Sequence, residues 1–246
     1  MNKTKIEWCD YTWNPVTGCL HGCEYCYARK IDKRFGDGKF TPTFYPKRLI
    51  EPVAIKKSSK IFVGSMADLF GNWDWESHDK TGIINRSEVI NRVLFTANHC
   101  QQHTFIFLTK NPKGMQDIIF PDNCWCGTSV ENQEKADERI PELLKVNCET
   151  LFVSYEPALG PIDFSFNIHD MIHPDNEGYG VEAIKGLQWL IIGSQTGPKA
   201  VEPKYEWIRL AFEQARNVNI PVFIKDNAAD YYGGELLPRE WPEVKA

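Results

Sequence analysis

The stretch Lys60-Ile61-Phe62-Val63-Gly64 is a short apolar run, and a second run, Thr104-Phe105-Ile106-Phe107-Leu108, follows after an amphipathic segment at 86–98. Both runs are rich in aromatic and β-branched residues, as buried parallel strands are. The segment between them places apolar side chains on one helical face: Val89, Ile90, Val93, Leu94 and Ala97. A strand, a helix and a strand in this order predict a right-handed crossover between parallel strands.

The same alternation continues along the rest of the chain. Further candidate strands are 125–129, 151–154, 189–193 and 221–225, with 11–16 as a first strand. Further candidate helices are 131–145 and 203–217. About seven such units predict an α/β protein with a partial or complete parallel (β/α) barrel of the TIM type. We expect one domain over residues 1–246, with loop insertions near 36–59 and 164–186.

Composition narrows the class of protein. The chain has 246 residues, eight cysteines and a net charge of -5. No apolar run approaches the ~18 residues of a membrane span, and the first residues lack the apolar stretch of a signal peptide. We therefore expect a cytoplasmic protein with reduced thiols and no membrane partner. The negative charge speaks against a protein that coats nucleic acid nonspecifically.

Three cysteines stand close together in the run Gly18-Cys19-Leu20-His21-Gly22-Cys23-Glu24-Tyr25-Cys26-Tyr27. Their spacing is Cys-x3-Cys-x2-Cys. Thiolates are the usual protein ligands of iron–sulfur clusters. We expect Cys19, Cys23 and Cys26 to bind three irons of one [4Fe-4S] cluster. The fourth iron would lack a protein ligand and would be open to a cofactor.

Two other interpretations of the triplet stay open. The first is a structural zinc site with His21 or Cys9 as fourth ligand, although such sites usually combine two Cys-x2-Cys pairs. The pair Cys124-Trp125-Cys126 is one residue too tight to be the second half. The other interpretation is three unrelated thiols in a glycine-containing loop. In the cluster interpretation His21 faces the sulfurs or solvent.

The cysteine spacing resembles that of the radical S-adenosylmethionine (SAM) enzymes. Tyr27 adds to the resemblance, because members of that superfamily often have an aromatic residue directly after the third cysteine. The resemblance implies SAM on the open iron, its reductive cleavage, and hydrogen abstraction from a substrate by a 5'-deoxyadenosyl radical. It also implies an electron donor such as flavodoxin or ferredoxin.

Polar residues follow nearly every predicted strand. In parallel barrels the active site forms at the C-terminal ends of the strands. The residues expected to bind SAM are Gly64, Ser65, Asp68, Ser129, Glu131, Glu156, Gly193 and Ser194, together with Tyr27. The residues expected to bind substrate are Lys110, Lys225, Asp226 and Asn227, although the two lysines are alternatively expected to bridge to Glu156 and Asp226. Helix capping is the competing role for any single Ser, Asp or Asn at such a turn.

A basic stretch follows the cysteines. From Arg29 to Lys60, ten basic residues stand against three acids. The interleaved aromatic residues are Phe35, Phe40, Phe44 and Tyr45. Positive charge mixed with aromatic rings can hold a phosphate backbone and stack on bases. This pattern favours a nucleotide or nucleic-acid substrate, and a solvated charged face is the competing explanation.

Eight stretches together resemble the phage Gp37/Gp68-like family, three-Cys-motif proteins with a domain of unknown function. They include Thr12-Trp13-Asn14-Pro15-Val16-Thr17-Gly18-Cys19 and the ranges 6–8, 22–28, 65–70, 108–110, 127–133, 156–162 and 236–242. The resemblance covers nearly the whole chain, and it implies a compact radical SAM-like barrel and a three-Cys-motif partner protein. Relatives commonly have Gly-Gly-Glu-Ser-Gly where this chain has Gly193-Ser194-Gln195-Thr196-Gly197, so their glutamate is replaced by the neutral Gln195.

These observations lead to one main hypothesis and one alternative. The main hypothesis is a radical SAM enzyme that acts on an unknown substrate. The alternative is a nonenzymatic module, in which zinc or a cluster stabilises the cysteine loop and the basic stretch binds DNA or RNA.

Overall fold

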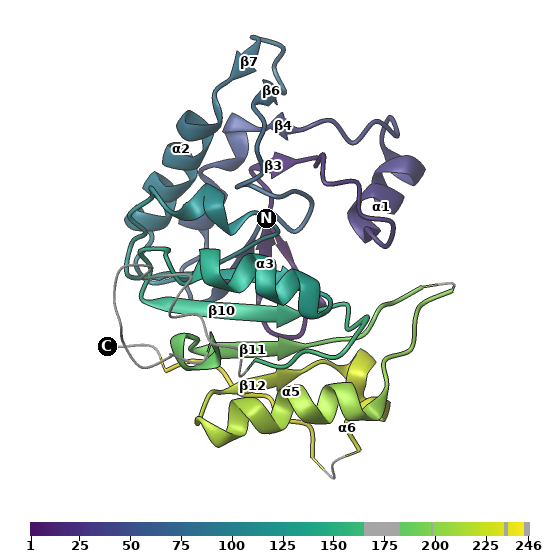
Figure 1. Ribbon diagram of the computed structural model, residues 1–246. Coiled ribbons are helices and arrows are strands. Elements are labelled where there is room, and N and C mark those ends of the chain that lie inside the picture. Colours follow the sequence, from purple (N-terminus) through teal and green to yellow (C-terminus); the bar gives the residue numbers. More distant parts are fainter. Residues whose placement is uncertain (165–182, 198, 234–235, 244–246) are drawn as a thin grey trace, which may run out of the picture. The chain divides into compact units, whose positions relative to one another are not determined.

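The computed structural model describes residues 1–164, 183–197, 199–233 and 236–243 (Figure 1). Hydrogen bonds order eight strands as β1-β2-β5-β8-β9-β10-β11-β12, and a separate sheet has the order β3-β4-β6-β7. The fold is therefore mixed α/β with a mostly parallel eight-stranded sheet. No hydrogen-bonded closure of this sheet is found among the described residues, so a barrel is not shown.

The chain divides into two compact units. Unit 1 comprises Met1–Gly114 and Ile118–Trp125, and unit 2 comprises Met115–Asp117 and Cys126–Ala246. No helix in the described part of the chain is long and apolar enough to cross a membrane.

In unit 1 the eight-stranded sheet contains β1 (Asn2–Lys3), β2 (Tyr11–Trp13), β5 (Lys60–Val63) and β8 (Thr104–Thr109). The strands β2, β5 and β8 are parallel, and β1 pairs antiparallel with β2. The helix α2 (Arg86–His99) follows Asn85, whose side chain accepts a hydrogen bond from the Ser87 N–H, and it lies between β5 and β8 in the chain. The predicted strand–helix–strand unit is confirmed. Ile61, Phe105 and Phe107 are fully buried, and each such side chain contributes about 1.5–3 kcal/mol to stability.

Unit 1 also contains the small second sheet, with strands β3 (Val16–Thr17), β4 (Thr43–Phe44), β6 (Trp75–Ser77) and β7 (Ile83–Ile84). The predicted single strand at 11–16 is wrong, because the chain leaves the first sheet at Pro15, which has no N–H to continue the ladder. The predicted loop at 36–59 is also more ordered than expected. It contains β4 and the 3-10 helices η1 (Pro46–Arg48) and η2 (Glu51–Ala54), where proline fits the first turn.

Unit 2 contains the parallel strands β10 (Thr150–Tyr155), β11 (Trp189–Ile192) and β12 (Val222–Ile224). The strand β9 (Cys124–Val130) begins in unit 1 and ends in unit 2. The helices are α3 (Gln133–Leu143), α5 (Tyr205–Asn217) and α6 (Ala229–Tyr232), with the 3-10 helices η4 (Ala183–Gly186) and η5 (Asp226–Ala228). Figure 1 shows α5 beside β12 and α6. Most of the loop predicted at 164–186 lies outside the described residues.

The helix α3 is shorter than the predicted range 131–145. Asn132 caps its first turn, with its side chain accepting a hydrogen bond from the Lys135 N–H at 3.0 Å. This cap fixes the start of the helix at Gln133 and leaves Glu131 outside it, directly after β9, where Glu131 pairs with Arg139.

Candidate metal and cofactor site

Three thiols lie on one loop of unit 1, residues 18–27, which we call the cysteine loop. It begins after β3 and ends at the first residue of α1 (Tyr27–Phe35). Gly18 has φ +88°, and a Cβ there would lie 2.1 Å from the Thr41 carbonyl oxygen, so only glycine fits. Cys26 is the N-cap of α1, and its Sγ accepts a hydrogen bond from the Arg29 N–H at 3.4 Å.

The thiols interact with one another electrostatically. Burial is the main cause that raises the pKa of Cys19 to about 12, the charges of Asp68, Cys23 and Cys26 raise it further, and a hydrogen bond from the His21 backbone opposes them. Among the described residues, no group of three or more His, Cys, Asp or Glu side chains is arranged to hold a metal ion.

The donor set of the loop nevertheless fits an iron–sulfur cluster. Backbone N–H groups are directed at two of the three sulfurs, from His21 to Cys19 and from Arg29 to Cys26. Hydrogen bonds to ligand sulfurs stabilise the thiolate and help to set the potential of a cluster. A cluster would be held by Cys19, Cys23 and Cys26.

Backbone contacts and one arginine fix the start of the cysteine loop. The Gly18 N–H donates to the Met66 carbonyl at 2.9 Å, and the Cys19 N–H donates to the Phe40 carbonyl at 3.2 Å. Arg29 Nη2 reaches back from α1 and donates to the Cys19 carbonyl at 2.9 Å. Its guanidinium also lies over the Phe40 ring, 5.3 Å from the centroid. The start of the loop is thus attached to the turn after β5, to the segment before β4 and to α1.

A buried carboxylate holds the middle of the loop. Asp68, which follows β5, accepts hydrogen bonds from His21 Nε2 (2.7 Å), Thr109 Oγ1 (2.7 Å), the Lys110 N–H (2.9 Å) and the Phe70 N–H (3.1 Å). Burial by itself raises the pKa of Asp68, but these hydrogen bonds and the charge of His21 outweigh it and hold the pKa below its usual value. Asp68 therefore joins the loop to the ends of β5 and β8.

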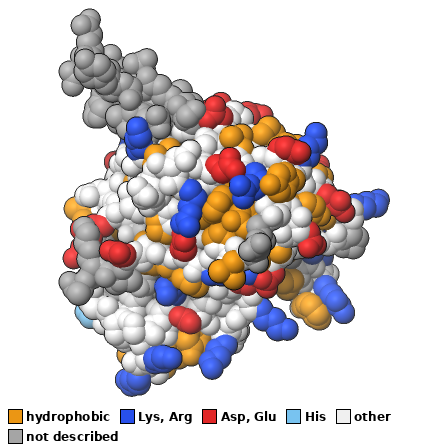
Figure 2. Space-filling model, turned by 90° about the horizontal axis from the view of Figure 1, so that it is seen from below, with side chains coloured by type: hydrophobic (Ala, Val, Ile, Leu, Met, Phe, Trp, Pro, Cys, Tyr) orange, Lys and Arg blue, Asp and Glu red, His pale blue; other side chains and the backbone are white. Residues whose placement is uncertain are grey.

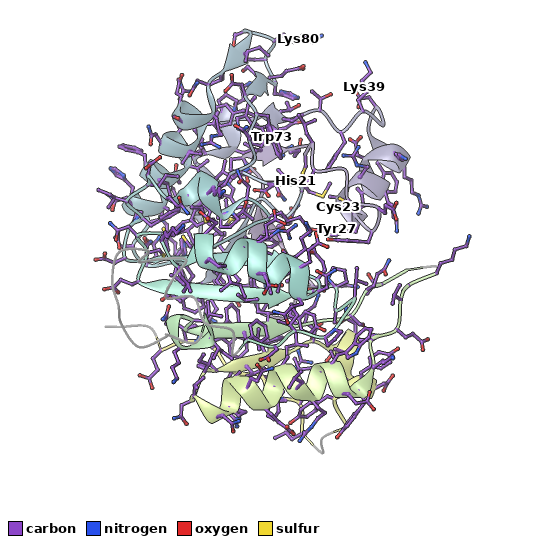
Figure 3. All side chains as sticks on the ribbon, in the orientation of Figure 1. His21, Cys23, Tyr27, Lys39, Trp73 and Lys80 are labelled. Carbon is purple, nitrogen blue, oxygen red and sulfur yellow. The ribbon has the colours of Figure 1, made fainter. Side chains whose placement is uncertain are left out.

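His21 was expected to face the sulfurs or solvent; the residue is exposed, and its ring is directed at Asp68. Its Nε2 is bonded to Asp68, and its ring lies edge-on to Trp73 with centroids 5.1 Å apart. Figure 3 shows His21 and Cys23 on the cysteine loop and Tyr27 at the base of α1. His21 is thus the side chain by which the loop is fastened to the sheet.

The turn after β5 meets the end of the loop. The Tyr27 hydroxyl donates to the Ser65 carbonyl. The Ser65 hydroxyl pairs with the side chain of Asn14 (3.0 Å), and the Met66 N–H donates to Asn14 Oδ1 (3.0 Å). Gly64 has φ +77°, and the nearest atom to a Cβ there is 3.7 Å away, so this backbone stays open to a close neighbour. The predicted residues Gly64, Ser65 and Tyr27 therefore lie together beside the thiols.

Lys110 belongs to the same group. Its Nζ donates to the Tyr25 hydroxyl and lies 4.9 Å from the centroid of the Tyr25 ring. The lysine predicted to bind substrate therefore contacts the cysteine loop from the end of β8, and it braces the segment between the second and third cysteines.

In unit 2 the predicted binding residues form pairs. Lys225 Nζ and Glu156 Oε1 form a salt bridge, with 16% and 25% of their side chains exposed, which confirms the alternative expectation for this lysine. A Cβ at Gly193 would lie 2.8 Å from the Glu156 carboxyl carbon, so glycine makes room for this carboxylate. Asp226 pairs with Arg239.

The other predicted residues of unit 2 also have protein partners. The Asn227 side chain donates to the Ser194 carbonyl at 2.8 Å and accepts from the Ser194 N–H at 3.2 Å. Arg139 bridges Glu131 (3.1 Å) and the carbonyl of Ser129 (2.8 Å). Ser129 and Glu131 are buried. These residues hold strand ends to following segments.

The aromatic residues of the basic stretch are less available for stacking on bases than the sequence suggests. Phe40 and Phe44 are buried and cannot stack on a base. Tyr45 lies between His78, at a centroid distance of 4.3 Å, and the Arg48 guanidinium, at 3.8 Å. Arg48 also donates to the Asn14 carbonyl at 3.0 Å. The aromatic residues between 40 and 45 therefore serve the core of unit 1.

Three site residues were not singled out from the sequence: Asn14 as a binding partner of Ser65, Tyr25 as a partner of Lys110, and Arg29 as a brace of Cys19. Tyr25 and Lys110 lie 85 positions apart. No local pattern marks such a contact, because it joins the cysteine loop to the residue that follows β8.

A sequence model of the family described as "Protein of unknown function (DUF5131)" matches residues 3–233. The "Uncharacterized protein MJ0683" of Methanocaldococcus jannaschii is similar to part of the chain, with 32% identity over 72 residues, 28% of this chain and 28% of that protein. The chain thus matches less than a third of that relative. No solved structure matches the chain.

Proposed function

We propose that this chain, which belongs to that family of unknown function, is a radical SAM enzyme in which Cys19, Cys23 and Cys26 hold a [4Fe-4S] cluster. When bound, the cluster supplies the electron for reductive cleavage of SAM, which leads to hydrogen abstraction from a substrate. The cysteine loop is the main support: three thiols within eight residues, two of which accept backbone hydrogen bonds. The resemblance to the phage Gp37/Gp68-like family agrees with the proposal.

The role of Asp68 differs from the one expected of a SAM ligand. Its two oxygens already accept four hydrogen bonds and its side chain is buried. In the proposed enzyme Asp68 holds His21 and thereby the position of the cysteines. Lys110 has a parallel role, since it holds Tyr25 within the loop.

Gly64, Ser65 and Tyr27 are the residues that support SAM binding next to the thiols. The open backbone at Gly64 allows a ligand to approach closely, and Ser65 is in contact with Tyr27 of the loop. Glu156, Gly193 and Ser194 lie in unit 2, and their role as SAM ligands stays a prediction; within that unit the Glu156 carboxylate pairs with Lys225.

Anaerobic reconstitution tests the proposal. The protein is loaded with iron and sulfide and reduced with dithionite, the reduced cluster is measured by EPR, and 5'-deoxyadenosine is measured after SAM is added. We expect a reduced-cluster signal and 5'-deoxyadenosine from the wild type. Cys23→Ala should lose both. Cys9→Ser is the matched control in the same unit, because Cys9 Sγ lies near the Ile6 carbonyl at 3.9 Å and is not in the triplet.

Two results would overturn the radical enzyme. A cluster that forms and is reduced without release of 5'-deoxyadenosine would favour the nonenzymatic module. Tightly bound zinc with no cluster after reconstitution would favour the structural zinc site. Loss of the cluster in Cys9→Ser as well would contradict the assignment of the three ligands.

A nucleotide or nucleic-acid substrate is the second part of the proposal. Lys47, Lys56 and Lys57 are exposed on the basic stretch, whereas Arg48 is bound to Asn14. With Phe40 and Phe44 buried, the lysines would act through phosphate, and binding should weaken with salt. Charge reversal of the three lysines should reduce affinity for a labelled oligonucleotide and flatten its salt dependence. Unchanged affinity would exclude this surface.

A further inference from the structure

The helix α1 carries apolar side chains on its solvent side. Tyr27, Ile31 and Phe35 are four positions apart, which places them in one line along the helix. Their exposed fractions are 50%, 42% and 75%, and Leu20 in the cysteine loop is 61% exposed. Only Ala28 of the helix is buried. Scattered single exposed apolar residues are ordinary, but a line of them on one helix indicates an interaction surface.

The same helix is basic in a chain that is acidic overall. Between residues 27 and 39, five basic residues stand against two acids, while the whole chain has a net charge of -5. Lys30, Lys33 and Arg34 are exposed, and the Arg34 guanidinium lies 4.9 Å from the centroid of the Phe35 ring. We call Leu20, Tyr27, Ile31 and Phe35, with Lys30, Lys33 and Arg34, the α1 surface.

The two acids near the α1 surface serve the loop that follows the helix. Asp32 Oδ2 accepts the Phe40 N–H at 3.0 Å, and Asp37 Oδ1 accepts the Lys39 N–H at 3.0 Å. Among the described residues no ion pair joins Lys30 or Lys33 to an acid. The positive charge of α1 is therefore not neutralised by a salt bridge at these two lysines.

Other exposed faces differ from the α1 surface. Figure 2 shows acidic, basic and apolar side chains next to one another on the face seen from below, where Figure 1 has α5. On α5 itself Arg209 pairs with Glu213 at 2.7 Å, and its guanidinium lies 5.6 Å from the Phe212 ring. Charge and aromatic surface there are already used within the chain.

We propose that the α1 surface is the docking site of an acidic one-electron carrier protein that reduces the cluster. This inference rests on the proposed function. Tyr27 directly follows Cys26, and a helix of nine residues is about 13 Å long, so a partner seated on α1 also covers the loop with the three thiols. One electron leaves the reduced cofactor of the carrier, and the cluster gains it.

Charge complementarity selects this partner. A negative protein is repelled by most of this acidic chain and attracted to the α1 surface, which orients the encounter and raises its rate. The surface is small, and redox encounters lie at the low end of interface size, below about 1,200 Å². A nucleic acid would use the lysines and the rings of Tyr27 and Phe35, but it would leave the exposed aliphatic side chains of Leu20 and Ile31 without a partner.

The test compares two reductants on the reconstituted full-length protein. Reduced flavodoxin is the acidic carrier used as probe, and dithionite is a small reductant that needs no docking site. Lys30→Glu with Lys33→Glu, and separately Phe35→Ser, should slow cluster reduction by flavodoxin at least tenfold and leave the dithionite rate unchanged. Wild-type reduction by flavodoxin should slow with salt, and the double lysine variant should lose that dependence. Lys3→Glu with Lys5→Glu is the matched control, because it reverses two exposed charges of unit 1 that lie outside α1 and the cysteine loop.

Several results would overturn the α1 surface alone: reduction by flavodoxin at the wild-type rate in the α1 variants, an equal loss in the Lys3 and Lys5 control, or salt-dependent binding of an oligonucleotide that is lost only in the α1 variants. A marked fall in the melting temperature of Phe35→Ser would show that this ring packs within the chain and would also overturn it. If dithionite reduces no cluster in the wild type, the proposed function itself fails, which is a different result.

Discussion

The polar residues after the parallel strands have different partners in the two units. In unit 1, Asp68 and Lys110 extend from β5 and β8 to the cysteine loop, where they hold His21 and Tyr25. In unit 2, Glu156 and Lys225 pair with each other at the ends of β10 and β12. The residue types are similar and the positions along the strands are similar. One set holds a loop that carries thiols, and the other set joins the ends of two strands that lie on either side of β11.

This difference shows what an ionisable residue at a strand end indicates. Such residues were all expected to bind ligand, yet each one described above has a protein partner. In unit 1 the partner belongs to the candidate metal loop, so a change there should affect both stability and cluster binding. In unit 2 the partner belongs to the scaffold, so a change should affect stability first.

The largest effect is expected at Asp68. Asp68→Asn removes a buried charge from four donors and should lower the free energy of unfolding by roughly 4 kcal/mol, as when a buried charged pair is broken. Urea unfolding measures this, and iron content after reconstitution should fall as well. Asp74→Asn is the control, because Asp74 is exposed and accepts one N–H, from Arg86 at 2.9 Å. Equal losses in both variants would contradict the role of Asp68 as the anchor.

The next effect separates two glycines of the same loop. Gly18→Ala should lower the free energy of unfolding by roughly 3 kcal/mol. The left-handed backbone accounts for about 1–2 kcal/mol of this loss, and the overlap of the new Cβ with Thr41 accounts for about 1–3 kcal/mol. Gly22 has φ +72°, but no atom lies within 4 Å of the Cβ that Gly22→Ala would add. Only the free-energy cost of the left-handed backbone therefore remains. Thermal unfolding compares the two. A larger loss in Gly22→Ala would mean that the contact between Gly18 and Thr41 does not restrict the loop.

The smallest effect is expected at the pair in unit 2. Because Glu156 and Lys225 are partly exposed, a double-mutant cycle of Glu156→Gln and Lys225→Met should give a coupling of only about 0.5–1 kcal/mol. Iron content should stay at the wild-type level. Loss of SAM affinity in Glu156→Gln at unchanged stability would sharpen the comparison, since it would restore Glu156 as a ligand. Loss of the cluster would remove the distinction between the units.

Local patterns predicted much of the scaffold. Strands β5, β8, β9, β10, β11 and β12 and helices α2, α3 and α5 were all expected near their observed positions. Side-chain periodicity is a local property, which is why these elements are readable. The second sheet was missed because β3, β4 and β7 have two residues each, too few to show a period.

The sequence by itself determined that three thiols share one loop after the first strands, because eight covalently linked residues cannot separate them. It also determined the alternation of strands and helices. Only the tertiary structure decided which charged side chains are engaged and with what. The His21 partner lies 47 positions away and the Glu156 partner 69 positions away, and such distances in sequence are closed only by the pairing of strands.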